Sequence, residues 1–169
     1  MSAHKKNLLD DLFQRRDSWR ERMSDATTLV KGKDLPWERN RHGKMKWYLH
    51  PGLDDRAMRS LLVFMQEIPP GGRTGKQKHQ GGLTHYIIEG RGYTMLNDEK
   101  HEWGPGDCVV FPILSHGVEY QHFNSDPKRP VIFIAAQPDL FDIIGVDMGS
   151  GFEQLEDAPG SEDRQQTTD

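Results

Sequence analysis

Histidines in and beside two strand-like segments are the residues of this chain best suited to metal chemistry. In the stretch 75–92, GKQKHQGGLTHYIIEGRG, His79 lies in a glycine-rich turn and His85 in the β-type run that follows. A second β-type run, 118–124 (VEYQHFN), carries His122. Imidazole nitrogens are common ligands of divalent metals. If the two runs pack against each other, the three histidines converge, and the pattern indicates a divalent-metal site between two strands.

Other polar side chains accompany these histidines. Gln77 offers an amide oxygen as a further metal ligand, and Tyr120 is the candidate catalytic residue because its hydroxyl can hydrogen-bond a substrate or a water. The candidate substrate-binding residues are His85, His116 and Lys78, the last because an ammonium attracts anions. Ordinary polar roles are expected for His4, His42, His50 and His101. The residues that complete the site stay open among His85, His116, Tyr120 and His122.

The elements that must position these side chains are short strands. Between residues 59 and 136, β-type runs alternate with Gly, Pro and Asn-Asp turns at a spacing of roughly ten residues. Side chains alternate between the two faces of a strand, so each run offers one face to a core. The pattern predicts an all-β closed sandwich or jelly roll.

The two segments resemble the paired motifs of the cupin superfamily. The run IIEGRG at 87–92 is similar to the end of the first motif, G-x5-H-x-H-x3–4-E-x6-G. The stretches 106–112 and 120–124 are similar to the second motif, G-x5-P-x-G-x2-H-x3-N. The resemblance covers about residues 60–138 and implies the cupin double-stranded β-helix, a jelly-roll barrel. The end of the first motif also resembles the corresponding sequence of the gentisate-type dioxygenases.

The resemblance implies which positions would bind a metal. At most of these positions the residue type differs from the family's metal ligand. The H-x-H pair falls on Gln77 and His79, the glutamate on Gly82 or Leu83, and the last histidine on Tyr120. By this resemblance Gln77, His79 and His122 would hold a divalent metal: iron first, with Mn, Ni or Zn as alternatives, or none if the site is degenerate.

Three functions are compatible with these observations. The first is a metal-dependent, oxygenase-like enzyme that acts on a small aromatic or hydroxylated organic substrate in the barrel pocket. The second is a non-catalytic cupin that has lost its metal and binds a small molecule or serves as a scaffold. The third, a metal-assisted isomerase or lyase, would use the same pocket.

Three regions are expected along the chain. Residues 1–50 form an N-terminal helix and edge-strand extension, residues 51–145 the cupin barrel, and residues 146–169 a flexible acidic tail that is disordered from Glu153 on. The helix at 5–23 has apolar residues at helical spacing and is expected to pack on the sandwich or on a second subunit. A homodimer is expected, with this helix and the strand around Trp47 as its contacts.

Composition sets further limits. The 169 residues suffice for one domain, the formal net charge of −4 without a basic stripe argues against a nucleic-acid partner, and no apolar run approaches the ~20 residues that span a bilayer. The one cysteine excludes an internal disulfide. A cytoplasmic protein with a small-molecule ligand is expected.

Overall fold

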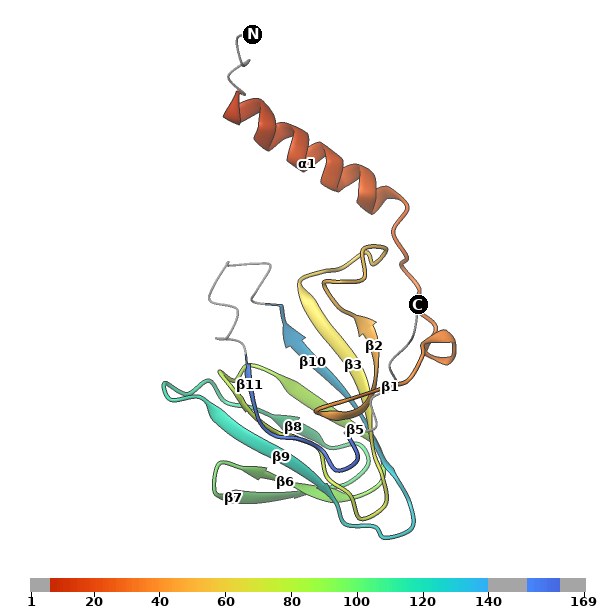
Figure 1. The fold of residues 1–169 in the computed structure, drawn as a ribbon, viewed down its shortest axis with the longest axis vertical. Coiled ribbons are helices and arrows are strands. Elements are labelled where there is room, and N and C mark those ends of the chain that lie inside the picture. Colours follow the sequence, from red (N-terminus) through yellow and green to blue (C-terminus); the bar gives the residue numbers. More distant parts are fainter. Residues whose placement is uncertain (1–6, 140–151, 162–169) are drawn as a thin grey trace.

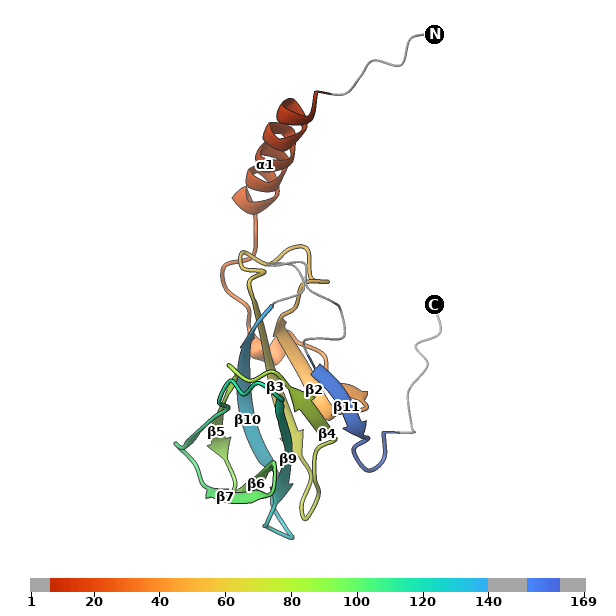
Figure 2. The same ribbon diagram turned by 90° about the vertical axis from the view of Figure 1, so that its left-hand side faces the viewer.

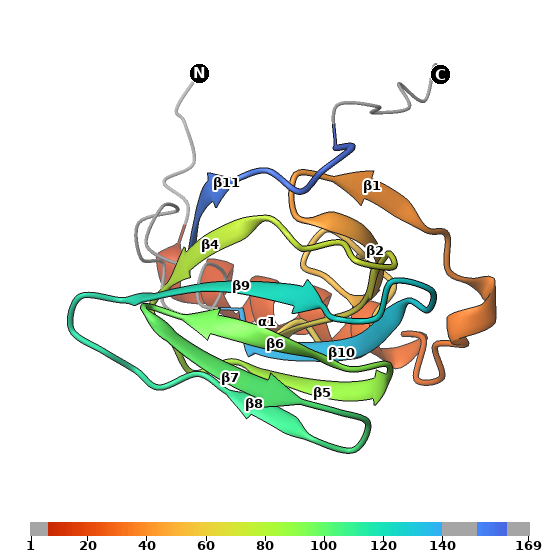
Figure 3. The ribbon, with the colours of Figure 1, turned by 90° about the horizontal axis from the view of Figure 1, so that it is seen from below.

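Two antiparallel β-sheets face each other in the computed structural model, which describes residues 7–139 and 152–161 (Figure 1). The six-stranded sheet has the order β1 (Glu38–Asn40), β2 (Gly43–Leu49), β3 (Leu61–Ile68), β10 (Val131–Pro138), β5 (Thr84–Glu89), β8 (Cys108–Val110). The five-stranded sheet has the order β11 (Phe152–Glu156), β4 (Lys76–His79), β9 (Val118–Asn124), β6 (Gly92–Leu96), β7 (Glu99–Trp103). Figure 3 shows the two layers end-on. The all-β jelly-roll prediction is confirmed.

Strict alternation of side chains builds the core between the sheets. In β3 every second residue is buried, beginning at Leu62, as expected for a strand with one face on a core. The buried side chains form two apolar clusters. One contains Met45, Phe64, Ile68, Ile87, Trp103, Val131, Phe133 and Ala135. The other contains Leu83, Phe111, Val118 and Tyr120.

The helix α1 (Leu8–Ser24) begins where the sequence provides a cap. The side chain of Asn7 accepts a hydrogen bond from the backbone N–H of Leu9 at 3.0 Å, which satisfies a group that has no partner inside the helix. None of the helix residues is buried among the described residues. Figures 1 and 2 show the helix extending away from both sheets. The expectation that it packs on the sandwich is therefore wrong, and packing on a second subunit stays a prediction.

Two expectations about the ends of the chain need correction. Strands β1 and β2 belong to the six-stranded sheet, so a boundary at residue 50 would separate them from their partner β3. Residues 43–45 of β2 pair with β1, so this part of β2 is not at the edge of the sheet. Only the rest of β2 lies at the edge, as the edge-strand prediction requires. The tail expected to be disordered from Glu153 on contains β11, which pairs with β4. The rest of the expected tail and the segment 140–145 lie outside the described residues.

Two glycines have similar left-handed backbone conformations but different surroundings, so substituting each by alanine separates the cost of backbone strain from the cost of a steric clash. Gly81 has φ +95°, and a Cβ there would lie 2.0 Å from the carbonyl oxygen of Pro112. Gly106 has φ +91°, and a Cβ there would meet no described atom within 4 Å. We expect Gly106→Ala to cost about 1 kcal/mol of unfolding free energy for its backbone strain, and Gly81→Ala about 3 kcal/mol because a backbone clash is added. Urea unfolding measures both, and equal losses would contradict the clash.

Candidate ligand-binding site

A cavity of about 340 Å³ opens inside the barrel, between the β1–β2 hairpin, β3, β4 and β11. It is lined by residues from six strands and from the β1–β2 turn and the segment after β2: Asn40, Arg41, His42, Met45, Trp47, His50, Pro51, Leu62, Phe64, Gln77, Gln137 and Gln154. Its size lies near the lower end of the range for small-molecule sites, about 300–1,000 Å³. Trp47 lies in this wall, and a subunit contact through its strand stays a prediction.

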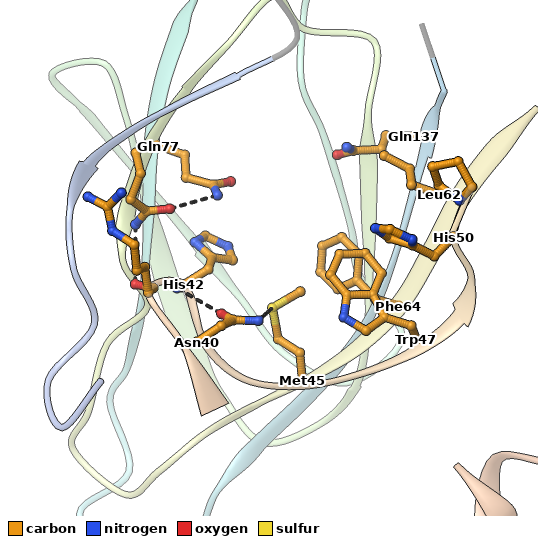
Figure 4. Close-up of a pocket in the computed structure, with 12 residues that line it drawn as sticks. Asn40, His42, Met45, Trp47, His50, Leu62, Phe64, Gln77 and Gln137 are labelled. Atoms are coloured by element: carbon orange, nitrogen blue, oxygen red, sulfur yellow. Dashed lines mark hydrogen bonds between the residues drawn. The ribbon is translucent and has the colours of Figure 1, made fainter. Parts of the chain in front are cut away.

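The cavity has two different walls, as Figure 4 shows. Phe64, Trp47 and Leu62 lie on one side, and Gln77 and His42 on the other. The rings of Trp47 and Phe64 meet edge to face with centroids 5.1 Å apart. A planar, partly apolar molecule could contact the aromatic wall while its polar groups face the amides and the imidazole.

Hydrogen bonds fix the amides of the polar wall. The Tyr120 hydroxyl donates to Gln77 Oε1 at 2.7 Å, and Gln77 Nε2 donates to Gln154 Oε1 at 2.9 Å. Gln154 Nε2 in turn donates to the carbonyl oxygen of Glu156 at 2.6 Å. The chain of bonds crosses β9, β4 and β11, so the strand wrongly expected to be disordered supplies part of the site. Burial raises the pKa of Tyr120, and its hydroxyl therefore stays protonated as a donor.

His42 is the polar side chain of the cavity that lacks partners. It is 5% exposed, and neither of its ring nitrogens has a hydrogen-bond partner among the described residues. Its backbone is held by Asn40 Oδ1, which accepts from the N–H of His42 at 2.9 Å, and by Gln66 Nε2, which donates to the carbonyl of His42 at 2.8 Å. Burial lowers the pKa of His42 to about 4, so the ring is neutral near pH 7 and carries one donor and one acceptor.

His85 and His122, two of the predicted site residues, lie deeper in the barrel and bind each other. His85 Nδ1 and His122 Nε2 are 2.7 Å apart, and His122 Nδ1 is 2.7 Å from Thr94 Oγ1. Trp103 Nε1 donates to that hydroxyl at 2.8 Å. His85 Nε2, the remaining ring nitrogen of the pair, has no partner within the described structure. Both rings pack against Phe111 and Phe133.

The donor atoms do not fit the metal expected from the cupin resemblance. His79 Nδ1 accepts from the N–H of Gly81 at 3.1 Å, and the oxygen of Gln77 already accepts from Tyr120. Leu83, at one candidate position for the family glutamate, is buried and offers no donor atom. Across residues 7–139 and 152–161, no three His, Cys, Asp or Glu side chains are placed to hold an ion together. Sites for divalent metals need such convergence of several ligands.

The remaining predicted substrate-binding residues lie apart from the cavity. His116 is exposed in the turn that precedes β9. Lys78 pairs with Glu119 in the β4–β9 register and does not line the cavity, whereas Gln77 does. His79 and His85 are buried but do not line it either. Of the residues predicted for the site, only Gln77 lines the cavity. Tyr120 lies behind Gln77 in the core and donates to it, and His85 and His122 bond to each other deeper in the barrel.

Sequence reasoning missed His42, which it treated as an ordinary polar residue. A signal was present in the stretch Asn40-Arg-His-Gly43: an asparagine and a glycine flank a two-residue turn, typical of a β-hairpin. The hairpin places His42 at the end of β2, whose inward face includes Met45 and Trp47. Gln154 could not be found in this way, because its segment has a composition typical of a solvated tail.

Comparison with known proteins agrees with this fold. Residues 64–136 match the model of the cupin domain family. The chain is similar in structure to the DMSP lyase DddQ from Ruegeria pomeroyi (TM-score 0.55, 16% identity, 81% of this chain and 76% of that one). It is also similar to the polyketide cyclase RemF from Streptomyces resistomycificus (TM-score 0.54, 18% identity, 66% of this chain and 79% of that one). Residues 64–136 are thus similar to a cupin domain, and at these identities the structural likeness shows the fold alone.

One similarity extends to a curated sequence. Over 91 residues the chain is 25% identical to the 5-aminosalicylate 1,2-dioxygenase of a Comamonas species. The match covers 54% of this chain and 24% of that protein, so the chain spans about a quarter of its relative's length. Among the described residues, no helix is both long and apolar enough to cross a membrane.

The neutral histidines predict a pH-dependent stability. The pKa of His42 is about 4 in the folded protein against 6.5 when unperturbed, so the unfolded state binds the proton first as pH falls. The stabilisation is complete above pH 6.5 and is lost as pH falls toward 4. We expect the free energy of unfolding of the parent to fall by about 2 kcal/mol more than that of His42→Gln between pH 7 and about pH 4.5. Urea titrations of both proteins measure this, and parallel pH profiles would contradict a buried neutral His42.

Proposed function

We propose that this chain is a cupin that binds a small organic molecule in the barrel cavity without a metal ion at the family's ligand positions. The observation that carries the proposal is the ring of His42, buried at the cavity wall with both nitrogens unpartnered among the described residues. A buried polar group without a partner costs about 1–3 kcal/mol. A ligand that bonds to this ring recovers that cost, and the cavity supplies the space for it.

The chemistry of the walls indicates the kind of ligand. His42 is neutral, the amides of Gln77 and Gln154 are uncharged, and the Arg41 guanidinium in the lining is already paired with Asp157 at 2.8 Å. The polar wall therefore matches groups that donate and accept hydrogen bonds without carrying charge. Burying a charged group against this wall would be costly without a paired opposite charge. Trp47 and Phe64 form the opposite side and favour a flat ring. The proposed ligand is a small aromatic molecule with an uncharged polar substituent.

Binding of benzamide tests this class, because its amide both donates and accepts beside a flat ring. We expect the parent to bind benzamide, and His42→Phe to raise the dissociation constant about tenfold because one buried hydrogen bond is lost. Ligand-observed NMR titration measures both constants. His101→Phe, at an exposed residue of β7, is the matched control and should bind as the parent does.

Two results would count against the proposal. Equal affinity of the parent and His42→Phe would remove His42 from the site. Failure of benzamide to bind at millimolar concentration would argue against an uncharged small aromatic ligand. Thermal unfolding of each variant separates loss of the site from loss of the fold, and His42→Gln, which keeps a donor and an acceptor, should recover part of the affinity.

A metal-dependent, oxygenase-like activity is the second candidate. Its support is the similarity to 5-aminosalicylate 1,2-dioxygenase over 91 residues. That activity would take an aromatic ring that carries a charged carboxylate, which the uncharged polar wall does not match, and of the four motif positions only His79 keeps a family metal ligand.

Metal loading distinguishes the two candidates. We expect less than about 0.1 equivalent of Fe, Mn, Ni or Zn to remain after anaerobic loading and desalting, since a defined site requires several ligands. We also expect no rise in thermal stability on adding these ions. Elemental analysis gives the stoichiometry. One equivalent of bound metal that His79→Ala abolishes, together with oxygen uptake on 5-aminosalicylate, would favour the oxygenase instead.

A further inference from the structure

The helix α1 leaves large apolar side chains in water. Four of them lie in its first two turns: Leu8 (75% exposed), Leu9 (58%), Leu12 (63%) and Phe13 (45%). Figures 1 and 2 show this end of the helix projecting away from both sheets. A single helix of this length is only marginally stable in water, and helices in proteins gain most of their stability by packing an apolar face. We therefore expect α1 to meet a surface outside the barrel.

The charged side chains are divided between the two sides of α1. At about 100° per residue, the apolar residues occupy one half of the helix surface: Leu8, Leu9, Leu12, Phe13, Trp19 and Met23. The arginines lie within this half or at its border: Arg15, Arg16, Arg20 and Arg22. The acids fill the remaining side: Asp10, Asp11, Asp17 and Glu21. One side of the helix is thus apolar and cationic, and the other is acidic.

The arginines of α1 belong to the same contact surface as its aromatic residues. The guanidinium of Arg16 lies 5.1 Å from the centre of the Phe13 ring, and that of Arg22 lies 4.8 Å from the centre of the Trp19 ring. Arg16 also pairs with Asp17 at 2.8 Å, but both side chains of this pair are about half exposed. Exposed ion pairs contribute little to stability. Phosphate oxygens could therefore take the place of the carboxylate at a small cost.

We propose that α1 is a peripheral membrane-binding helix, which lies along the surface of a bilayer that contains anionic lipids. The apolar residues of its first two turns enter the interface between headgroups and acyl chains. The arginines contact the headgroup phosphates, and the acids on the opposite side face water. The charge division described above complements an anionic surface on one side of the helix only, so it also fixes which side faces the lipid.

The positions of two arginines favour a bilayer over an apolar groove on another protein. A helix that binds in a groove presents an apolar stripe at i, i+3, i+4 and i+7. Around α1, however, Arg20 lies between Leu9 and Phe13, and Arg16 lies next to Leu9. A closed groove would bury these guanidinium groups, which is costly without paired charges. At a bilayer surface their aliphatic stems stay on the apolar side while the charged ends reach the headgroups.

The rest of the chain is compatible with this orientation. The C-terminal half of α1 touches the barrel, where the guanidinium of Arg59 lies 5.3 Å from the centre of the Trp19 ring. The first two turns therefore make the deepest contact with lipid. The net charge of −4 opposes an anionic surface only at short range, since exposed charges are screened over about 8 Å at physiological ionic strength. Binding along the surface requires no membrane-spanning segment.

Co-sedimentation of the full chain with lipid vesicles tests the proposal. We expect binding to phosphatidylcholine vesicles that contain about 30% phosphatidylglycerol, and little binding to phosphatidylcholine alone, because the arginines pair with anionic headgroups. Arg16→Gln combined with Arg20→Gln should lower the partition coefficient on the mixed vesicles about 30-fold, or about fivefold per arginine. Leu12→Gln combined with Phe13→Gln should lower it at least about tenfold, because less apolar surface is buried.

The matched control changes two charges on the other side of the helix. Asp10→Asn combined with Glu21→Gln should bind the mixed vesicles at least as tightly as the parent, because carboxylates only oppose an anionic surface. Thermal unfolding shows whether the barrel of each variant is intact, which is expected because none of the residues of α1 is buried. Loss of binding with an unchanged barrel then reports on the helix alone.

Three results would overturn the proposal. The first is a parent that stays in the supernatant at about millimolar mixed lipid, where even one marginal anchor binds. The second is equal binding by the parent and the double arginine variant, which would remove the cationic side from the contact. The third is self-association of the chain through α1, seen by sedimentation velocity, without any lipid binding. That result would assign the apolar side to a second copy. None of these results bears on ligand binding in the barrel cavity.

Discussion

The hydrogen bond from the Tyr120 hydroxyl to the Gln77 amide joins the core of this protein to its cavity. The two residues are direct partners in the β4–β9 register, so the sheet brings them together without a flexible segment. The hydroxyl of a buried tyrosine needs an acceptor, and the amide that accepts it becomes a fixed donor toward Gln154. The two side chains occupy positions where the cupin motifs place histidines. Their bond therefore fixes the character of the site as uncharged.

The same preference for neutral polar groups extends through the interior. Burial lowers the pKa values of His42, His85 and His122, with His42 near 4 and His122 near 3. His85 and His122 bond to each other and His122 also bonds to Thr94, which leaves only His85 Nε2 without a partner among the described residues. His42 has neither ring nitrogen partnered there, and it alone of the three lines the cavity. His42 is therefore the residue proposed to meet a ligand.

The two faces of β3 meet different surroundings. Its residues Leu62 and Phe64 line the cavity, while Val63 and Met65 lie on the other face of the strand. This difference follows from one property of strands, the alternation of side chains between two faces. The aromatic side of the cavity is thus held by the central pairing of β3 with β2 and β10.

Short apolar runs separated by turn residues were enough to predict the jelly roll, because such runs mark where strands begin and end. The strand at Val118–Asn124 could be predicted from its own residues. The sequence pattern also indicated that Gln77 and Tyr120 belong near the site. Three features became visible only in the folded chain: His42 has no partner among the described residues, His85 and His122 bond to each other, and residues 152–156 form a strand. Each of these depends on contacts between residues far apart in the chain. The Arg41–Asp157 ion pair and the Gln77–Gln154 bond, for example, join residues that are 116 and 77 positions apart. Composition or spacing within a local segment carries no record of them.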